Sequence, residues 1–347
     1  MIEALSHDIA DYPEGIVLPV NKPYRWTSAD VIRKLKFAAF RHFRKKNLKV
    51  GHAGTLDPLA TGVLLVCIGN ACKRAQELQD HDKEYIADIR FGATTPSYDL
   101  EKDVDRRFPY EHITVDAIQE ALKGFLGPQE QIAPLFSAKS VDGVRAYEMA
   151  RKLYKAHSCH SEQPCHSERS EESLFDATAL ETLHRSRIVI SELELLSFYP
   201  EGTDVPKSVA TLGNKRGLCP LLSPAAFSPS TFLLSQKPGY GRAPDGALLA
   251  THEEGSRSDD WGTLVPAGSS TASNRINVSD TSALGLPEAV IRIACSKGTY
   301  IRAFARDLGE ALGSGAHLSR LVRSRSGDYR LEDCLSVEQA LDLLKEG

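Results

Sequence analysis

Apolar residues along this chain gather in short runs that are separated by polar, turn-rich segments. The most continuous run covers 63–68, directly after a loop rich in glycine, and it predicts a buried strand. In 85–91 every second residue is apolar, so one face of that strand is expected to be buried. The segments 188–198 and 289–295 predict two further strands.

Helices are indicated by capping residues that precede apolar residues at helical spacing. The expected helices are one from Thr27 or Ser28 to about Phe40, one capped by Thr114 with Ile113 and Ile118 as a hydrophobic staple, one over 299–312, and a last one opened by the capping box of Ser336 and Gln339. These helices and strands do not alternate as regular βαβ units. The pattern therefore predicts an α+β fold.

Composition narrows the class of protein. Hydrophobic residues make up 41% of the 347 positions, which allows a sizeable core, and no apolar run approaches the ~18 residues that cross a membrane. The N-terminal sequence MIEALSHD is acidic where a secretory signal would be basic. Seven cysteines without a Cys-x-x-Cys pair argue against a disulfide framework or a zinc ribbon. We therefore expect a cytoplasmic protein.

The loop 51–62 holds three glycines and two groups capable of chemistry, His52 and Asp57. Taken alone, Asp57 before Pro58 is more often a helix N-cap with proline in the first helical position. A lone histidine such as His52 is more often a hydrogen-bonded structural residue. The loop by itself leaves these alternatives open.

A basic run leads into this loop. Between Arg33 and Lys49 there are eight Lys and Arg residues and no acidic residue. Such a run is usually a solvated helix face, but it also suits a phosphate backbone lying beside a reactive site. The net charge of the whole chain is −4, yet the acidic excess lies mostly in 156–286 and in the last residues.

Five segments, in order, resemble the motifs of the TruB family of tRNA pseudouridine synthases, and together they cover roughly 15–155 and 288–335. They are Asn21-Lys22-Pro23 with Thr27-Ser28, GHAGTLDPLATGVLLVCIG at 51–69, Lys83-Glu84-Tyr85, Ser137-Ala138-Lys139 with Gly143, Tyr147 and Ala150-Arg151, and SKGTYIR at 296–302 with Asp307-Leu308-Gly309 and Gly315-Ala316-His317-Leu318. Five ordered matches are far more specific than one motif.

The resemblance implies roles for individual residues. Asp57 matches the family's catalytic aspartate, a nucleophile that needs no metal. Arg302 matches the arginine that pairs with that aspartate, and such a cation favours the ionised carboxylate. Tyr85 matches the tyrosine that stacks on the target base and helps to remove the C5 proton. A strand residue facing the core is the alternative for Tyr85, and both readings are compatible.

The target base must leave its stack before chemistry. By resemblance, His52 fills the place vacated by the flipped base. Tyr300 and Leu321 match residues of the pocket wall, and Lys22 belongs to the family's lysine-proline turn and is expected in substrate binding. The loop 94–99 departs from a more acidic family pattern, because Pro96 stands where aspartate is common, and Asp99 is expected to keep part of that role.

The resemblance also implies a fold and a domain plan. We expect a pseudouridine synthase fold: a mixed, largely antiparallel sheet with flanking helices and a central RNA-binding cleft. The catalytic domain comprises 1–155 and 288–335, and the strand 188–198 of the same domain pairs with 289–295. We predict a polar low-complexity insertion at 156–187 without common zinc spacing, a largely disordered insertion at 199–287, and a C-terminal helix at 336–347 without a separate C-terminal RNA-binding domain.

The expected function is isomerisation of uridine 55 in the T-loop of tRNA to pseudouridine. We expect tRNA as partner, no metal or cofactor, no obligate protein partner, no membrane association, and a monomer. Two alternatives stay open: a relative of the guide-RNA-dependent pseudouridine synthases, and a non-catalytic module that binds or folds tRNA.

Overall fold

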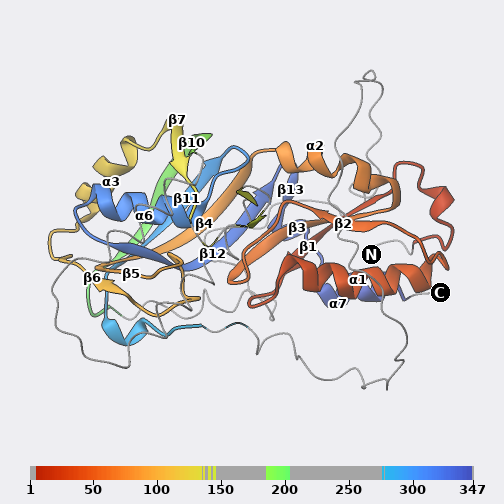
Figure 1. The fold of residues 1–347 in the computed structure, drawn as a ribbon, viewed down its shortest axis with the longest axis horizontal. Coiled ribbons are helices and arrows are strands. Elements are labelled where there is room, and N and C mark those ends of the chain that lie inside the picture. Colours follow the sequence, from red (N-terminus) through yellow and green to blue (C-terminus); the bar gives the residue numbers. More distant parts are fainter. Residues whose placement is uncertain are drawn as a thin grey trace.

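The computed structural model describes residues 5–134, 136, 140–141, 144–145, 185–203, 276 and 278–345. Within them a nine-stranded sheet runs across the molecule (Figure 1). Its order is β1 (Ile16–Lys22), β3 (Ala60–Ile68), β12 (Ala316–Ser326), β4 (Lys83–Phe91), β11 (Glu288–Cys295), β10 (Arg185–Tyr199) and β7 (Gly127–Ile132), with β2 (Val50–Ala53) paired to β3 and β13 (Tyr329–Arg330) paired to β12.

The sheet is mixed and mostly antiparallel. Only β12 and β3 pair in parallel among the described neighbours, and every other described pair is antiparallel. Two short ladders lie outside it, β5 (Ala93–Thr94) with β6 (Arg106–Arg107), and β8 (Ser140–Val141) with β9 (Val144–Arg145). The expected α+β class with a mixed, largely antiparallel sheet is confirmed.

Helices cover the sheet in two groups (Figure 1). At one end α1 (Ser28–His42) packs beside α7 (Val337–Leu343), which lies on β1. At the other end α3 (Val115–Lys123) and α6 (Ile301–Ala311) lie against β10, β4 and β12. The short helix α2 (Ala75–Asp80) follows the 3₁₀ helix η2 (Gly69–Arg74), and further 3₁₀ turns are η1 (Ile9–Asp11), η6 (Ser282–Leu284) and η7 (Leu331–Asp333).

The helix starts follow local capping chemistry. Thr27 caps α1 in a full capping box with Asp30, Thr114 caps α3, and Ser336 forms the expected capping box with Gln339 at α7. These caps satisfy backbone N–H groups that would otherwise lack partners at the first turn. The helices expected from the sequence are confirmed, except that α7 ends at Leu343, short of the expected end of the chain.

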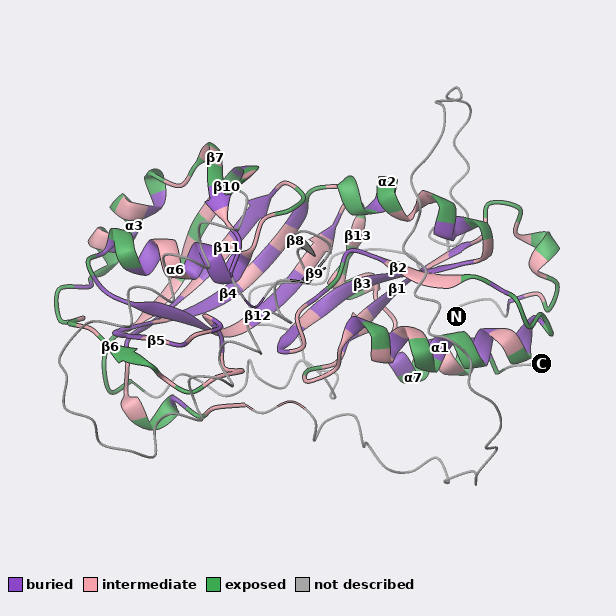
Figure 2. Ribbon diagram, viewed as in Figure 1, coloured by how far each residue is buried: buried purple, intermediate pink, exposed green. Residues whose placement is uncertain are grey.

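One continuous apolar core lies under both helix groups (Figure 2). It contains Leu64, Val66 and Ile68 of β3, together with residues of α1, α3, α6 and α7. The alternate residues of β3, Val63, Leu65 and Cys67, belong to a second, smaller cluster on the opposite face. The run 63–68 is therefore buried on both faces, which explains why it shows no polar alternation.

The expected pairing of 188–198 with 289–295 is confirmed as β10 against β11, with Leu193 opposite Ile293 and two register shifts. The described ends of 199–287 pack onto the domain. The backbone N–H of Gly202 donates to Gly285 O at 3.0 Å, and that of Ser279 donates to Leu100 O at 2.8 Å. The predictions for 156–184 and for 204–275 fall on residues outside the described parts.

None of the described helices is long and apolar enough to cross a membrane. The described ranges also hold no group of three or more His, Cys, Asp or Glu side chains placed to bind a metal ion. Cys67, Cys72, Cys295 and Cys334 carry free thiols.

Candidate active site

The loop between β2 and β3 carries Asp57 in a tight turn. Ala60 N donates to Asp57 O at 3.1 Å, and no helix begins at Pro58. The reading of Asp57 as a helix N-cap is therefore wrong, although it does precede a turn. Gly54 (φ +82°) and Gly62 (φ +105°) adopt backbone angles that favour glycine on either side of the carboxylate.

The start of α1 fixes this loop. Leu56 N donates to Ser28 Oγ at 3.0 Å, and Ser28 Oγ donates to Leu56 O at 3.2 Å. Arg25 N donates to Pro58 O at 3.0 Å. Because backbone groups at both ends of Asp57 are bonded to α1 and the turn before it, its carboxylate is held in one position.

Lys22 adds a third anchor. Its ammonium is fully buried and donates to three backbone carbonyls: Pro23 at 3.0 Å, Trp26 at 2.6 Å and Pro58 at 3.1 Å. Burial lowers the pKa of Lys22 to about 7, although the nearby Asp57 carboxylate opposes that shift. With its three donors occupied, Lys22 is better placed to hold the loop than to touch a substrate.

Arg302 meets Asp57 in a bidentate ion pair from the first turn of α6. Its Nε donates to Asp57 Oδ2 at 2.8 Å and its Nη2 to Asp57 Oδ1 at 3.0 Å. The guanidinium also donates to the carbonyls of Ser97 and Phe136, at 3.2 and 2.9 Å. Burial acts to lower the pKa of Arg302, but the Asp57 and Asp99 carboxylates outweigh it and raise that pKa above its ordinary value.

A second carboxylate faces Arg302 from the loop after β5. Asp99 Oδ2 lies 3.7 Å from Arg302 Nε, and its Oδ1 accepts hydrogen bonds from Ser97 Oγ and Glu101 N. Burial raises the pKa of Asp99, and the charge of Arg302 acts against that rise. Arg302 is thus buried between two carboxylates, of which Asp57 is the more exposed, at 37% of its side chain.

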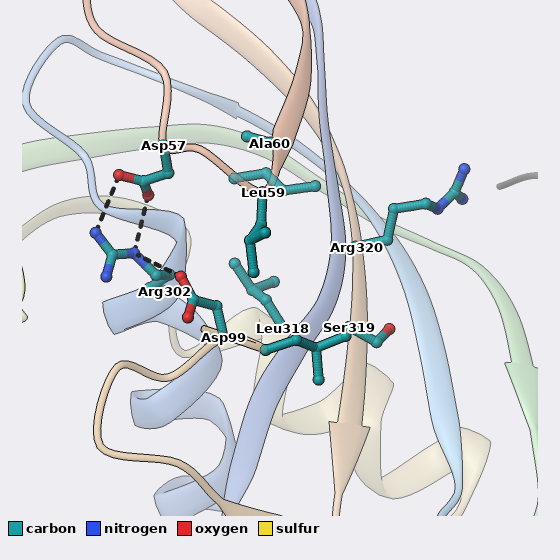
Figure 3. Close-up of a pocket in the computed structure, with 10 residues that line it drawn as sticks. Asp57, Leu59, Ala60, Asp99, Arg302, Leu318, Ser319 and Arg320 are labelled. Carbon is teal, nitrogen blue, oxygen red and sulfur yellow. Dashed lines mark hydrogen bonds and ion pairs between the residues drawn. The ribbon is translucent and has the colours of Figure 1, made fainter. Parts of the chain in front are cut away.

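An open pocket lies beside this pair (Figure 3). Asp57, Asp99 and Arg302 form its polar side, and the apolar side comes from β12 and the start of β3. The lining residues there include Leu59, Ala60, Leu318 and Leu321. Figure 3 shows Arg320 pointing away from the polar side of the pocket. Its guanidinium pairs with Asp88 at 2.7 Å.

Tyr85 lies next to this pocket on β4. Its side chain is 8% exposed and stands opposite Arg323 in the β4–β12 register. Burial raises the pKa of the Tyr85 hydroxyl, whereas a hydrogen bond and the charge of Arg323 lower it. Arg323 itself is 1% exposed and donates to Val63 O at 2.7 Å and Gly54 O at 3.1 Å.

His52 on β2 shares this neighbourhood. Burial and the Arg323 charge lower the pKa of His52, so its ring is neutral at pH 7. Its Nδ1 atom is buried and has no hydrogen-bond partner within the described structure. The expectation of a hydrogen-bonded structural histidine thus does not describe this ring nitrogen.

The structure brings three of the expected site residues into one pocket, Asp57, Arg302 and Leu321. Tyr300 is the residue before α6, and its backbone N and O bond to Gln131 of β7 at 2.9 and 3.2 Å. These bonds fix the start of the helix that presents Arg302. Tyr300 is not among the residues that line the pocket described above.

Sequence reasoning missed Arg323. Its segment, RLVRSRSGDYR, reads as a basic, solvent-facing stretch, and nothing in it marks one arginine as buried. If 316–326 is read as a strand, Leu321 and Arg323 lie on one face and Arg320 lies on the other. That reading would have placed Arg323 on the same side as Leu321. The sequence did single out Asp99, although without its contact to Arg302.

Comparison with known proteins identifies the class. Residues 41–167 match the family model described as TruB family pseudouridylate synthase (N terminal domain), and 302–346 match the tRNA pseudouridylate synthase B C-terminal domain. A relative named tRNA pseudouridine synthase B from Phocaeicola vulgatus is 38% identical over 328 residues, covering 94% of this chain and 92% of its own. Proteins of that name from Bacteroides fragilis and Parabacteroides distasonis are 37% and 36% identical and cover 94% and 97% of this chain, and 92% and 96% of theirs.

Among solved structures, one of a Cbf5–Nop10–Gar1 complex is similar, with a TM-score of 0.48 and 18% identity, covering 96% of this chain and 56% of that one. The curated relatives and the matched models show that the class is that of the pseudouridylate synthases. Within that class, the chain belongs to the TruB family.

Proposed function

We propose that this protein converts uridine to pseudouridine in tRNA, at position 55 of the T-loop, with Asp57 as the nucleophile. The observation that carries the proposal is the bidentate pair of Asp57 and Arg302 at an open pocket of a TruB-family chain. Relatives named tRNA pseudouridine synthase B support tRNA as the substrate class.

The reaction is an isomerisation. The N1–C1′ bond of the uridine breaks, the uracil turns, and a C5–C1′ bond forms. The C5 hydrogen leaves as a proton, and N1 gains one. Asp57 attacks through its carboxylate, which its two hydrogen bonds from Arg302 hold in place. Attack at C1′ and attack at the ring would use the same carboxylate oxygens.

Other residues prepare the base for this step. A uridine inside an RNA loop must be turned out of its stack to reach the pocket. His52 would enter the place that the base leaves. Tyr85 would stack on the uracil, while Leu321 forms part of the apolar wall of the pocket.

The proposed chemistry needs no redox step and no Lewis acid, since bonds are exchanged within one nucleotide. We therefore propose that the chain works without metal, cofactor or protein partner, and as a monomer. Its partner is the T-arm of tRNA.

The proposal is tested with the purified chain alone. It is incubated with a tRNA transcript and with the same transcript carrying cytidine at position 55, and pseudouridine is mapped by mass spectrometry. We expect product at position 55 of the first transcript and none in the second. Asp57→Asn keeps the shape of the side chain but removes the nucleophile, so we expect no product. Asp116→Asn, on the exposed first turn of α3, serves as control.

Other outcomes separate the alternatives. Binding of tRNA without any pseudouridine would favour a non-catalytic module. Product that appears only after a guide RNA and accessory proteins are added would favour the guide-dependent class. Product at the wild-type rate from Asp57→Asn would overturn the nucleophile assignment.

A further inference from the structure

The outer face of α1 is strongly basic and is not part of the pocket. Eight cations on α1 and the following turn are exposed in the folded chain: Arg33, Lys34, Lys36, Arg41, Arg44, Lys45, Lys46 and Lys49. We call these residues the α1 basic surface. Figure 2 shows the exposed positions along the outside of α1.

These cations have almost no carboxylate partners. Arg33 pairs with Asp30 at 2.8 Å, and none of the other seven forms an ion pair with a described residue. The neighbouring helix α7 carries Glu338 and Asp342, so the positive surface does not extend onto it. Like charges held this close repel one another, and a polyanion relieves that repulsion.

Exposed aromatic rings lie among the basic side chains of α1. Phe37 is 65% exposed in the middle of α1, and the Arg41 guanidinium lies 5.8 Å from its ring centroid. Lys34 stands 5.0 Å from the Trp26 ring, and Lys36 stands 5.5 Å from the Phe40 ring. A basic face with accessible aromatic rings is typical of surfaces that track a nucleic-acid backbone and stack on its bases.

The helix α1 connects this surface to the candidate active site. α1 begins at Ser28, which is bonded to Leu56 in the Asp57 loop, and extends from there over 15 residues, or about 22 Å. The chain then turns and returns along β2 to the same loop. The RNA on either side of a turned-out base must lie on the surface beside the pocket.

We propose that the α1 basic surface binds the phosphate backbone of the substrate RNA on the flank of the pocket, with Phe37 contacting a base or ribose. This inference rests on the proposed function and names a binding surface that acts apart from the chemistry. The surface contributes affinity through released counterions, whereas the Asp57 pocket carries out the isomerisation.

The test removes charge from α1 at a distance from the Asp57 loop. The triple variant Lys36→Gln, Arg41→Gln, Lys45→Gln keeps side chains that suit a helix. The matched control neutralises Lys73, Lys123 and Lys345 in the same way, because these exposed lysines lie away from α1, on η2, on α3 and just after α7. Binding of the tRNA transcript is measured at several salt concentrations, and pseudouridine formation is measured in single turnover with enzyme in saturating excess.

We expect the α1 triple variant to bind tRNA at least tenfold more weakly at low salt. Its slope of log K against log salt should be smaller by about three, or one per lost phosphate contact. Its single-turnover rate at saturation should match wild type. Phe37→Ala should weaken binding without changing the slope, because stacking releases no counterions.

Equal binding and equal slopes for the α1 triple variant and its control would overturn the inference. So would a lower saturated rate with unchanged binding. If the wild-type chain forms no pseudouridine in tRNA at all, the proposed function fails, and the binding data still decide whether α1 holds RNA.

Discussion

Arg302 fixes the position of the two carboxylates at the pocket. Its planar guanidinium bonds both oxygens of Asp57 and faces Asp99 at the same time. A lysine carries the same charge but cannot make the two parallel bonds. Asp57 would then be free to rotate, and the geometry of the attack that we propose for it would be lost.

We therefore expect Arg302→Lys to lower the saturated single-turnover rate by about a hundredfold or more, the scale seen when one preorganised polar group is removed from an active site. Binding of tRNA should change little. The control is Arg306→Lys, one turn later in α6, where the guanidinium pairs with Asp307. A rate for Arg302→Lys close to that of wild type would mean that charge alone suffices.

The site could be predicted only in part, and individual residues show why. Asp57 and Arg302 are 245 positions apart in sequence, so no local pattern joins them, and only the family motifs suggested their pairing. Lys22 was expected to bind substrate, which stays a prediction, and its bonds to three carbonyls were not predictable because no sequence pattern reveals them. Arg323 was missed because burial of one arginine in a basic strand depends on its neighbours in the sheet.

At the scale of elements, Lys22 links β1 to the Asp57 loop. The free-energy cost of burying its ammonium group depends on pH. Its pKa is about 7 in the folded chain and 10.5 in the unfolded reference. Between these values the unfolded chain binds more protons, so the free energy of unfolding rises with pH. The destabilisation caused by burying the Lys22 ammonium is therefore largest below pH 7 and decreases as the pH rises toward 10.5.

Comparison with Lys22→Met isolates this effect. We expect the unfolding free energy of wild type, relative to the variant, to rise by about 4 kcal/mol between pH 6.5 and 10. Urea unfolding of both proteins at several pH values measures it. A difference that stays constant with pH would show that the ammonium titrates normally in the folded chain.

The parallel pair of β3 and β12 depends on Gly62. Its φ is +105°, and a Cβ added there would lie 2.2 Å from Arg323 O and 2.8 Å from Arg323 N. Backbone atoms of a central strand cannot move aside cheaply. We therefore expect Gly62→Ala to lower the free energy of unfolding by about 3 kcal/mol or more, measured by urea unfolding.

Gly127→Ala is the matched control. Gly127 also has a positive φ, +93°, but an added Cβ there would meet nothing within 4 Å. Only the backbone strain remains, which costs about 1–2 kcal/mol. Equal losses for the two variants would show that strain, and not the contact with Arg323, sets the requirement for glycine at position 62.

Elements were predictable where their causes are local. The capping residues Thr27, Thr114 and Ser336 lie next to the helices they start. The order of the sheet was not predictable in this way, because β12 inserts between β3 and β4 from far along the chain. The parallel pairing of β12 with β3 results from long-range packing. No short turn joins the two strands, so no local sequence signal predicts their pairing.

At the scale of the whole molecule, the two matched family models do not correspond to two separate folding units. Residues 302–345 supply most of α6, all of β12 and β13, and α7. β12 lies between β3 and β4, and one apolar core joins these strands to both helix groups. The described residues should therefore unfold in a single cooperative transition.

Two deletions of different character test this architecture. A chain that ends at residue 301 loses β12, which leaves β3 and β4 without their shared partner and opens the main core. We expect no cooperative thermal transition and rapid proteolysis.

Replacing 204–275 with a flexible linker leaves every described contact in place, including the bond of Gly202 N to Gly285 O. Since longer loops add little closure entropy, we expect the Tm of this variant to stay within a few degrees of wild type. A cooperative transition in the first variant, or its loss in the second, would contradict a single catalytic domain built from both ends of the chain.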